Sequence, residues 1–558
     1  MNKSEPESPH YYLIISFFAL LFPLLLLCFR SLDDNRLTSW QWTFYNVNTF
    51  WFFCLLVGGI VAALVLSRFE PNRLKPLVLF LVSFLAAAMF WDEPEVIVDA
   101  ARYITQAKQL SVNGTGYFFS EWGKDVFAWT DLPLVPFLYG LLFKLFGESR
   151  VVIQFCTTGL FSGTVVLVYC LGKLLWDEET GFNGALLLLA IPYLYTQIPL
   201  MLVDVPTMFL LLLAVYLYTL VLINGGVVTI LLSGLGLFCV FYAKYSTWVL
   251  LAGLSVTFLT TVLSSPAHTL KRTSGVIVVA VILIGAAFYL KQEVFLEQIR
   301  FLFAYQKPGL GRWGEGYLST FFFQIHIFVT AGMLWSAWVA YIKRDYRYLN
   351  LACFVLIIFL LNLQRIRYAL PLFPFIVLLA SYGIKEIDSR RIRRFIVLCA
   401  VCSSLVVAQL AYLPFLKNMS ANNIQEAGVF LNRKGIDVVE VIPLFDEDDI
   451  VNPELAVPLL DYFTESRVYY ASGQARPNPE KYRTSSLRFT WEYQPPALYQ
   501  PEPQSLASEK ALAIIASKRN QPLPPSVRKK IAGFTQQRTF NRTTGVFRHQ
   551  TIVSVYYN

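Results

Sequence analysis

Charge and histidine are scarce in this sequence. Of its 558 residues, 15% are charged and only 4 are histidine, whereas 56% are hydrophobic. The histidines are scattered and make no set of metal ligands. Walker A, GxGxxG and HExxH patterns are also missing, which argues against nucleotide-driven pumping and zinc proteolysis.

Cysteine is missing from the polar C-terminal part of the chain. All 8 cysteines lie in apolar segments, so no disulfide framework is expected in that part. The net charge of +9 does not indicate nucleic acid as a partner, because the basic residues stand beside apolar runs and act as topology signals. The acidic run 446–449 lacks the alternating ligands and the turn glycine of a calcium loop, which favours a solvated turn.

Long apolar runs, by contrast, are abundant. Many of them approach the ~20 residues that a helix needs to cross a bilayer, and only helices give such long runs. We therefore predict an all-α polytopic membrane protein of the cell membrane. Its predicted transmembrane helices, about 13 in number by this pattern, are 11–30, 48–67, 75–91, 151–172, 182–201, 205–223, 227–243, 247–263, 275–290, 318–342, 349–363, 368–384 and 395–416.

The positions of lysine and arginine predict the orientation of these helices. When the N-terminus is placed in the cytoplasm, nearly every short basic cluster falls on the cytoplasmic side, as the positive-inside rule requires. This count works only if 133–147 does not cross. That segment is short for a span and is interrupted by Lys144, so we predict a helix on the membrane surface. The chain after about residue 416 is then extracytoplasmic.

The segment 92–150 is predicted to form a large outer loop that carries the chemistry. Asp92 and Glu93 directly follow an apolar run, and ionisable groups at the mouth of a membrane helix are candidates for a functional site. An amphipathic helix over 94–110 comes next, and the surface helix over 133–147 follows it. This loop belongs to a predicted transmembrane domain over 1–416.

Residues 417–558 change character and predict a small extracytoplasmic α/β domain. The stretch around 476–503 is polar and rich in proline, so the middle of the domain is expected to be loose. A helical pattern covers 422–432, and strand-like runs cover 438–442, 468–470, 511–515 and 551–557.

Acidic and guanidinium groups are predicted to share the outer face. Asp92 could act as a general base, because a carboxylate at a partly dry surface has a raised pKa and activates a hydroxyl held against it. Arg365 and Arg367 stand at the outer end of a span, and arginine suits bidentate binding of phosphate. A base opposite a phosphate clamp describes group transfer from a phosphate-linked donor, and the membrane setting suggests that the donor carries a lipid tail.

Each of these residues also has a purely structural interpretation. The two carboxylates after the third span can mark a helix end that faces water, and the two arginines can be anchors that snorkel to the lipid headgroups. Asp204 precedes a Val-Pro pair and fits a helix N-cap. Lys244 fits an anchor at the end of a span.

Several short motifs occur in a fixed order between residues 75 and 384. In this order they resemble the GT-C superfamily of polyprenyl-phosphate-dependent glycosyltransferases, and within it the dolichyl-phosphate-mannose protein mannosyltransferases and the bacterial aminoarabinose transferases that modify lipid A. Each motif is weak alone, but the series is specific. The motifs are Trp91-Asp92-Glu93, Leu132-Pro133-Leu134, Leu202-Val-Asp204-Val-Pro206, Ala243-Lys244 and Arg367-Tyr368-Ala-Leu-Pro371.

The resemblance implies a membrane glycosyltransferase with a GT-C-like fold and juxtamembrane helices in its first outer loop. An acceptor hydroxyl would attack a sugar held on a polyprenyl phosphate, with inversion at the anomeric carbon. Asp92 matches the outer-loop aspartate that acts as base in this family, and Glu93 matches the neighbouring acid. Asp204 matches a second outer-loop acid that helps to shape the site, and Arg367 matches an arginine suited to the lipid phosphate.

The sequence departs from this family before the second surface helix. The aminoarabinose transferases have Asp-Lys-Pro-Pro where this chain has Thr130-Asp131-Leu132-Pro133, so the lysine that would meet the phosphate is absent. Lys124, Arg365 or Lys244 could replace it. The Trp-Trp-Asp signature of oligosaccharyltransferases is also missing, which argues against transfer of whole glycans to asparagine.

A transporter or lipid flippase is the main alternative function. It should show repeated halves and polar residues in mid-span, whereas these spans are almost uncharged, which favours the enzyme. A third interpretation is a scaffold whose C-terminal domain binds other envelope proteins. For the enzyme, the expected partners are a polyprenyl-phosphate-linked sugar, a protein, lipid or glycan acceptor, and membrane lipids. No metal site is predicted, although carboxylates could hold a divalent cation as a cofactor.

Overall fold

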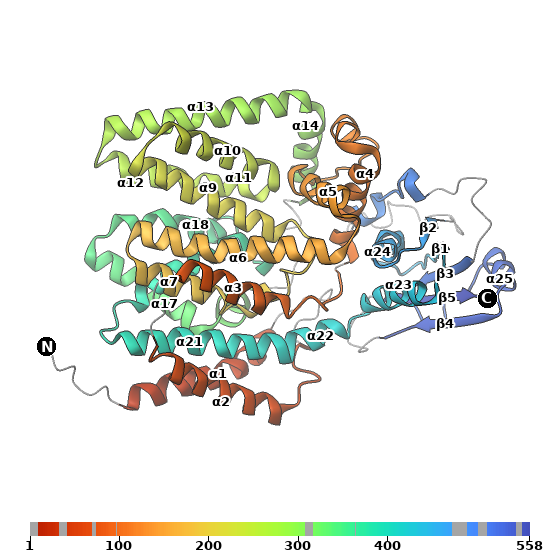
Figure 1. Cartoon of the computed structure of the whole chain (residues 1–558), viewed down its shortest axis with the longest axis horizontal. Coiled ribbons are helices and arrows are strands. Elements are labelled where there is room, and N and C mark those ends of the chain that lie inside the picture. Colours follow the sequence, from red (N-terminus) through yellow and green to blue (C-terminus); the bar gives the residue numbers. More distant parts are fainter. Residues whose placement is uncertain are drawn as a thin grey trace.

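A bundle of long helices with a small β-sheet at one end makes up the protein (Figure 1). The computed structural model describes residues 9–32, 42–69, 74–95, 97–306, 316–362, 364–470, 488–499, 510–542 and 550–558. We call the end of the bundle that carries the sheet the sheet end, and the opposite end the far end.

Seven helices of the described residues are long and apolar enough to cross a membrane, by length and composition, and six shorter apolar helices accompany them. The prediction of an all-α polytopic membrane protein is therefore confirmed. The seven are α1 (Pro9–Arg30), α2 (Thr49–Leu66), α6 (Arg150–Leu175), α9 (Asp204–Asn224), α13 (Pro266–Leu290), the run Ile366–Ile384 with α19 (Ile366–Ala369) and α20 (Phe373–Ile384), and the run Arg390–Lys417 with α21 (Arg390–Val407) and α22 (Leu413–Lys417). The shorter ones are α3 (Lys75–Ala88), α5 (Leu134–Phe146), α10 (Val227–Ala243), α11 (Ser246–Leu251) with α12 (Gly253–Val262), α17 (Ile327–Lys343), and the run Tyr346–Leu360 with α18 (Leu349–Leu360).

Two predicted spans are not single helices. The span 318–342 is interrupted at Ile325, where φ is −109° and ψ is 134°, and continues as α17 from Ile327. In the span 182–201 the break lies before a proline. Helix α7 (Glu178–Leu188) ends early, and a single turn, α8 (Pro192–Tyr195), follows. Ile191 has φ −118° and ψ 94°, because the residue before a proline is disfavoured in helical geometry. The chain between α8 and α9 consequently runs through the buried interior as turns rather than as a helix.

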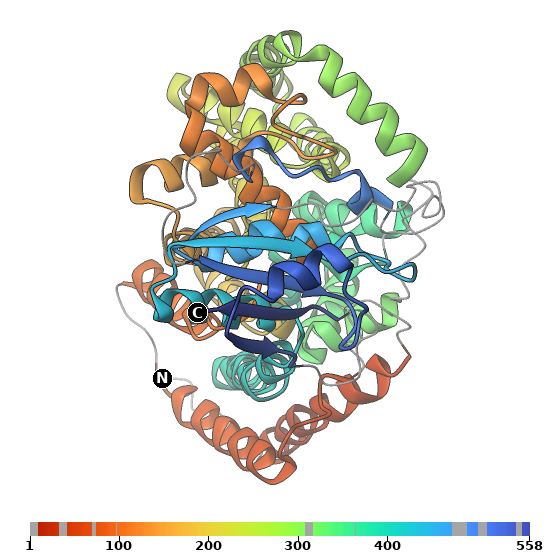
Figure 2. The ribbon, with the colours of Figure 1, turned by 90° about the vertical axis from the view of Figure 1, so that its right-hand side faces the viewer.

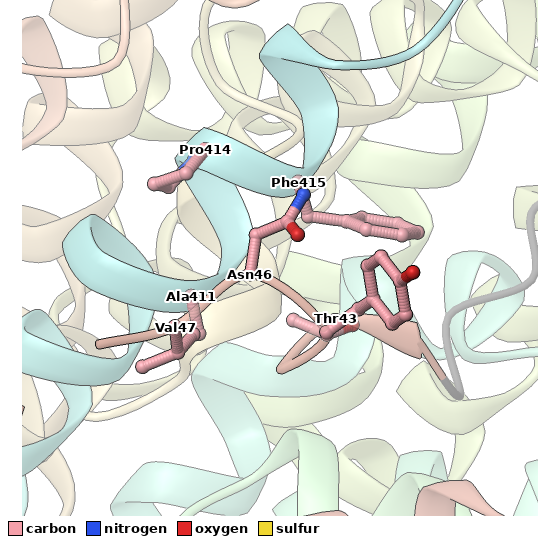
Figure 3. Close-up of a pocket in the computed structure, with 7 residues that line it drawn as sticks. Thr43, Asn46, Val47, Ala411, Pro414 and Phe415 are labelled. Carbon is pink, nitrogen blue, oxygen red and sulfur yellow. The ribbon is translucent and has the colours of Figure 1, made fainter. Parts of the chain in front are cut away.

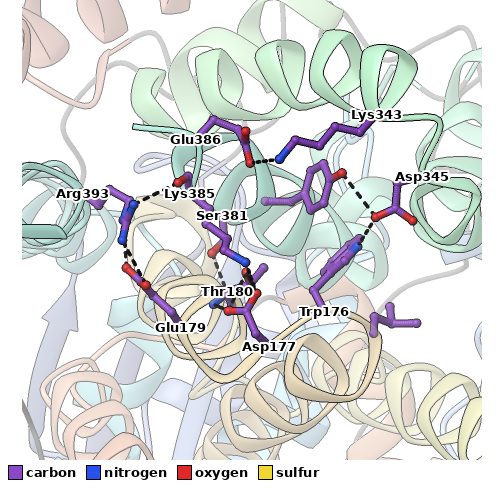
Figure 4. A network of polar contacts seen from close by, with 12 residues as sticks. Trp176, Asp177, Glu179, Thr180, Lys343, Asp345, Ser381, Lys385, Glu386 and Arg393 are labelled. Carbon is purple, nitrogen blue, oxygen red and sulfur yellow. Dashed lines mark hydrogen bonds and ion pairs between the residues drawn. The ribbon is translucent and has the colours of Figure 1, made fainter. Parts of the chain in front are cut away.

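At the far end, charged side chains join the ends of α7, α20 and α21 (Figure 4). Asp177 caps α7 by accepting from the amide of Thr180 at 3.0 Å, and it also pairs with Lys385 after α20. Glu179 of α7 accepts from both Nε (2.8 Å) and Nη2 (3.1 Å) of Arg393 in α21. We call these four residues the far-end network: Asp177, Glu179, Lys385 and Arg393.

At the sheet end, two helices lie across the long ones (Figure 1). Helix α4 (Ile97–Glu121) covers the amphipathic segment predicted over 94–110 and continues past a kink at Gly114, where φ is 90°. Helix α5 covers the second predicted surface helix. Gly140 of α5 lies against Leu110 of α4, where an added Cβ would lie 2.7 Å from the Leu110 Cβ, so the glycine allows the two helices to pack closely.

The C-terminal part of the chain forms a five-stranded sheet in the order β2-β1-β3-β5-β4. Strands β1 (Val438–Pro443), β2 (Arg467–Tyr470) and β3 (Lys510–Ala516) are parallel, whereas β5 (Ile552–Tyr557) runs antiparallel to β3 and to β4 (Gln536–Phe540). Helices α23 (Asn422–Lys434), α24 (Ala456–Phe463) and α25 (Pro525–Ile531) accompany it. The prediction of a small C-terminal sheet domain is confirmed. Figure 2 shows the sheet lying across the end of the bundle, with α4 in orange to one side.

Candidate functional site

A buried carboxylate with two cations stands at the sheet end of α9. The Asp204 side chain is fully buried, and its Oδ2 accepts from Nε (2.9 Å) and Nη2 (2.7 Å) of Arg367. Its Oδ1 accepts from Nζ of Lys244 at 2.5 Å. Lys244 follows the last residue of α10. These bonds show that the carboxylate is committed to two cations, and its neighbour Val203 is the N-cap of α9.

Arg367 joins Asp204 to a second aspartate. Its Nη1 donates to Oδ2 of Asp99 in the first turn of α4. On the other side, Oδ1 of Asp99 accepts from Nη2 of Arg102 at 3.0 Å. A helix of the first loop, the start of α9 and the start of α19 thus meet at one guanidinium. We call these five residues the sheet-end cluster: Asp99, Arg102, Asp204, Lys244 and Arg367.

The charge balance of the cluster shifts the pKa of its outer carboxylate. Burial alone would raise the pKa of Asp99, but the cations Arg367 and Arg102 outweigh burial and hold that pKa well below its ordinary value. Asp99 is therefore ionised at neutral pH. Removing one partner from a buried ion pair commonly costs about 3–5 kcal/mol, because the other charge stays buried. Burying these charged side chains consequently costs free energy of desolvation, which their mutual ion pairs must offset.

A third carboxylate, that of Asp131, also contacts Arg102. Its Oδ1 lies 3.3 Å from Nη2 of Arg102, and its Oδ2 accepts from Nε2 of Gln106 at 3.2 Å. Burial raises the pKa of Asp131, against the opposing effect of Arg102. Asp99, Arg102 and Gln106 lie at helical positions i, i+3 and i+7, so α4 presents one polar stripe to this part of the site.

One further cation, Arg365, lies beside the cluster at an aromatic ring that Lys244 also approaches. The guanidinium carbon of Arg365 lies 5.8 Å from the centre of the Tyr368 ring, and Nζ of Lys244 lies 6.0 Å from it. Arg365 also contributes to the low pKa of Asp99. The structure thus brings together all four residues that the sequence predicts for substrate binding: Asp204, Lys244, Arg365 and Arg367.

Asp92 lies outside this cluster. Its side chain is 80% exposed, and its Oδ2 lies 3.2 Å from Nζ of Lys417 at the end of α22. Two residues that precede Lys417, Pro414 and Phe415, line a small pocket together with the segment before α2 (Figure 3). The predicted base is therefore an exposed carboxylate that pairs with Lys417 at the end of α22.

Glu93 is buried in a different set of contacts. It lies with Glu95 and Arg150 behind the turn that joins α3 to α4, and both glutamates are 2% exposed. Arg150 donates to Oε1 of Glu95 at 3.2 Å, to the carbonyl of Trp91 at 3.1 Å and to the carbonyl of Glu93. Burial, then the charge of Glu95, raise the pKa of Glu93 well above its ordinary value. This predicted acid therefore faces the interior of the fold.

The same turn is tied to the start of α9. Oε2 of Glu95 accepts from the amide of Met201 at 3.0 Å, three residues before Asp204. Arg150 and Glu95 together fix the segment that leads into Asp99 against the segment that leads into Asp204. Sequence analysis missed this pair, because the fold brings the Arg150 and Glu95 side chains together across a gap of 55 residues.

The C-terminal domain also contacts α4. Lys108 pairs with Glu148 at 3.3 Å and with Asp461 of α24. One turn before Lys108, the hydroxyl of Thr105 lies 3.3 Å from that of Tyr493, which follows a short 3₁₀ helix (Arg488–Glu492). Burial raises the pKa of Glu148 to about 7, with Lys108 opposing the rise. The helix that carries Asp99 is thus held between the bundle and the C-terminal domain.

Metal-ligating groups do not gather in this region. Within the described ranges, no group of three or more His, Cys, Asp or Glu side chains could hold a metal ion. In the cluster itself, each of the two aspartates is paired with cationic side chains.

Comparison with known proteins relates the chain to membrane glycosyltransferases. Residues 131–290 match the family model described as dolichyl-phosphate-mannose-protein mannosyltransferase. This segment contains Asp131, Asp204 and Lys244. A search of curated proteins finds no significant match.

Solved structures show the same fold at low sequence identity. ArnT from Cupriavidus metallidurans bound to undecaprenyl phosphate is 13% identical, with a TM-score of 0.58 over 86% of this chain and 97% of that chain. The apo state of ArnT is 12% identical, with a TM-score of 0.57 over the same shares. The archaeal oligosaccharyltransferase AglB from Archaeoglobus fulgidus, in complex with an inhibitory peptide and a dolichol-phosphate, is 12% identical, with a TM-score of 0.48 over 80% of this chain and 70% of that chain. The two ArnT structures thus show that this chain shares their fold, which agrees with the resemblance to GT-C glycosyltransferases.

Proposed function

We propose that this protein is a membrane glycosyltransferase that moves a sugar from a polyprenyl phosphate to an acceptor hydroxyl. One observation carries the proposal: Arg367, Lys244 and Arg365 gather beside two aspartates at the sheet end of the bundle. The fold is that of ArnT, one structure of which holds undecaprenyl phosphate. Cations near a buried acid suit a lipid phosphate, whose charge grows as the sugar leaves.

The three cations would bind the phosphate in different ways. Arg367 presents a planar fork that suits two phosphate oxygens. Lys244 and Arg365 flank it around Tyr368 and add charge without competing for the same position. Lys244 thereby takes the place of the lysine that is absent before the second surface helix. Asp204 orients both Arg367 and Lys244 from the buried side.

Two aspartates are candidates for the base. The family resemblance assigns the base to Asp92, which lies beside Lys417. We propose Asp99 instead, because its carboxylate contacts Arg367 directly and a base must lie within reach of a hydroxyl that attacks a phosphate-linked carbon. Asp92 remains the matched alternative, and a pair of variants distinguishes the two.

The proposed reaction is a single displacement. The acceptor oxygen forms a bond to the anomeric carbon while the bond from that carbon to the phosphate oxygen breaks, and its electron pair stays on the phosphate. The acceptor proton passes to the base. Attack from the side opposite the phosphate inverts the anomeric carbon. Base and cations supply about 10²- to 10⁴-fold and 10²- to 10³-fold in rate, respectively, as such groups commonly do.

The proposal includes a place for this reaction. With the N-terminus in the cytoplasm, the sheet end lies on the extracytoplasmic side, together with the domain over 417–558. Lys385 and Arg393 of the far-end network then lie on the cytoplasmic side, as the positive-inside rule requires. Donor and acceptor meet where α4 and α5 lie across the membrane-spanning domain over 1–416.

The test is a donor screen with the purified full-length protein. The protein is incubated with a panel of polyprenyl-phosphate sugars in detergent, with and without a chelator of divalent cations, and released polyprenyl phosphate is measured. We expect release with at least one donor, increased by the matching acceptor. Uptake of labelled substrate into vesicles without any release would instead favour the transporter alternative.

The same assay compares the two candidate bases. We expect Asp99→Asn to lower turnover by about 10³-fold, because the amide cannot take the acceptor proton, while Asp92→Asn keeps turnover within about threefold. Intact folding of both variants is checked by thermal unfolding. A loss in Asp92→Asn alone would return the base to Asp92 and leave the rest of the proposal in place.

A further inference from the structure

Every nitrogen of the Arg367 guanidinium already donates to a carboxylate. Nε and Nη2 donate to Asp204, and Nη1 donates to Asp99. An incoming phosphate that binds the guanidinium through two oxygens therefore competes with these carboxylates for its charge and its N–H groups. Whether Asp99 or Asp204 is displaced determines whether the proposed base, Asp99, is still bound to Arg367 after the donor binds.

The two carboxylates hold Arg367 unequally. Asp204 is wholly buried, takes two of the three nitrogens and is also fixed by Lys244. Asp99 takes one nitrogen, its side chain is 17% exposed, and it has Arg102 as a second cation. A carboxylate that loses its partner while buried is costly, whereas Asp99 can lose Arg367 and keep Arg102. Asp99 is thus the group that yields.

We propose that the phosphate of a polyprenyl-phosphate ligand displaces Asp99 from Nη1 of Arg367, so that donor binding itself releases Oδ2 of Asp99 for the acceptor hydroxyl. This inference rests on the proposed function and adds an order to it. Before the donor binds, Asp99 is occupied by an arginine and cannot accept a proton from the acceptor. After the donor binds, its carboxylate faces the site.

The position of the released carboxylate is fixed by the remaining bond. Oδ1 stays on Nη2 of Arg102 at 3.0 Å, and Arg102 is in turn held by Asp131 at 3.3 Å. The loss of Arg367 also removes the first of the three cations that lower the pKa of Asp99. The base therefore becomes stronger at the moment it is needed, and the acceptor is activated only in the presence of the donor.

The test measures the affinity of undecaprenyl phosphate, without a sugar, for the purified protein. If Asp99 competes with the phosphate for Arg367, Asp99→Asn must bind this lipid more tightly than the unchanged protein does. We expect about tenfold, the order of one charge-assisted hydrogen bond. Arg367→Ala should weaken binding at least as much. Asp448→Asn, whose carboxylate is 84% exposed in the C-terminal domain, is the matched control and should change nothing.

The outcomes separate this inference from the proposed function. Unchanged or weaker binding in a folded Asp99→Asn variant overturns the exchange and leaves the glycosyltransferase proposal standing. Absence of lipid binding in the unchanged protein overturns both. If Asp99→Asn does not fold, Asp99→Ser carries the same test. Tighter binding in Asp99→Asn, together with its loss of turnover, supports the exchange, because a purely structural Asp99 would not improve affinity when removed.

Discussion

The two charged regions of this protein are built from the same residue types but differ in burial. In the far-end network, the side chains of the Lys385–Asp177 pair are 38% and 34% exposed, and Asp177 also caps a helix. In the sheet-end cluster, Arg367 and Asp204 are 11% and 0% exposed. Exposed pairs gain little and cost little, whereas buried pairs require several bonds to offset desolvation.

This difference separates a structural role from a functional one. The far-end network ties helix ends where the chain turns, and each of its members has a local reason to be there. The sheet-end cluster buries more charge than a helix end requires, since Asp204, in the first turn of α9, is also bound by Arg367 and Lys244. The comparison predicts that changes at the sheet end alter chemistry, and that changes at the far end alter only stability.

The largest effect is expected for Arg367→Ala. Its removal leaves Asp204 and Asp99 without their shared cation, and the leaving phosphate loses a positive partner. We expect kcat/KM for the donor to fall by about 10³-fold, with little change in the KM for the acceptor. Arg367→Lys keeps the charge without the fork and should recover part of the loss. An equal rise in both KM values would remove Arg367 from the phosphate site.

A smaller loss of turnover is expected for Arg150→Met, because Arg150 is proposed to position the turn before Asp99 and not to contact the substrate. Arg150 fixes the turn from Trp91 to Glu95, and this turn sets the distance between Asp99 and Asp204. We expect kcat to fall by about 10- to 100-fold while the affinity for undecaprenyl phosphate stays within threefold. Arg150→Lys, which keeps one bond, is the control. A change confined to lipid affinity would contradict the positioning role.

The contact between α4 and the C-terminal domain gives a pH-dependent prediction. Burial raises the pKa of Glu148 to about 7 in the folded protein, above its unfolded value. This group therefore favours folding fully below its unfolded pKa, and that advantage is lost as the pH rises through 7. We expect Glu148→Gln to stabilise the protein at pH 8 by about 1 kcal/mol relative to pH 5. Thermal unfolding at both pH values measures it, and an equal effect at both would contradict the assignment.

The smallest effect is expected for Glu179→Gln at the far end. The Glu179 side chain is 27% exposed, and Arg393, at 10%, keeps two backbone carbonyl acceptors. Loss of the Glu179 charge should therefore cost about 1 kcal/mol of stability and leave turnover within about twofold. Denaturant unfolding and the donor-release assay measure the two quantities. A large loss of turnover here would break the distinction between the two ends of the bundle.

Much of the fold can be predicted from the pattern of apolar and polar residues in the sequence. Apolar runs predict the membrane helices, and the Val-rich and Ala-Ile-rich runs predict β1 and β3 because both strands are buried. Strand β4 escapes prediction, since Gln536 to Thr539 are polar and exposed and only pairing with β5 makes them a strand. The break at Ile191 has a local signal, the proline that follows it.

The candidate site is predictable only in part. The charge-based topology gathers Asp204, Lys244 and Arg367 at one end of the bundle, and their side chains do meet there. Asp99 and Arg102 have a signal, the i, i+3 spacing of opposite charges, but such pairs usually face water on an amphipathic helix. Tertiary packing turns this stripe inward, and no local pattern states which acid of the loop will be buried.

The contact between Lys108 and Asp461 has a consequence for the order in which the molecule is completed. The two residues are separated by 353 positions, so during synthesis α4, which bears Asp99 and Lys108, is translated long before Asp461. The membrane-spanning helices are therefore translated first, and the domain that contacts α4 is translated last. The contact between α4 and the C-terminal domain can form only after the whole membrane-spanning part has been synthesised.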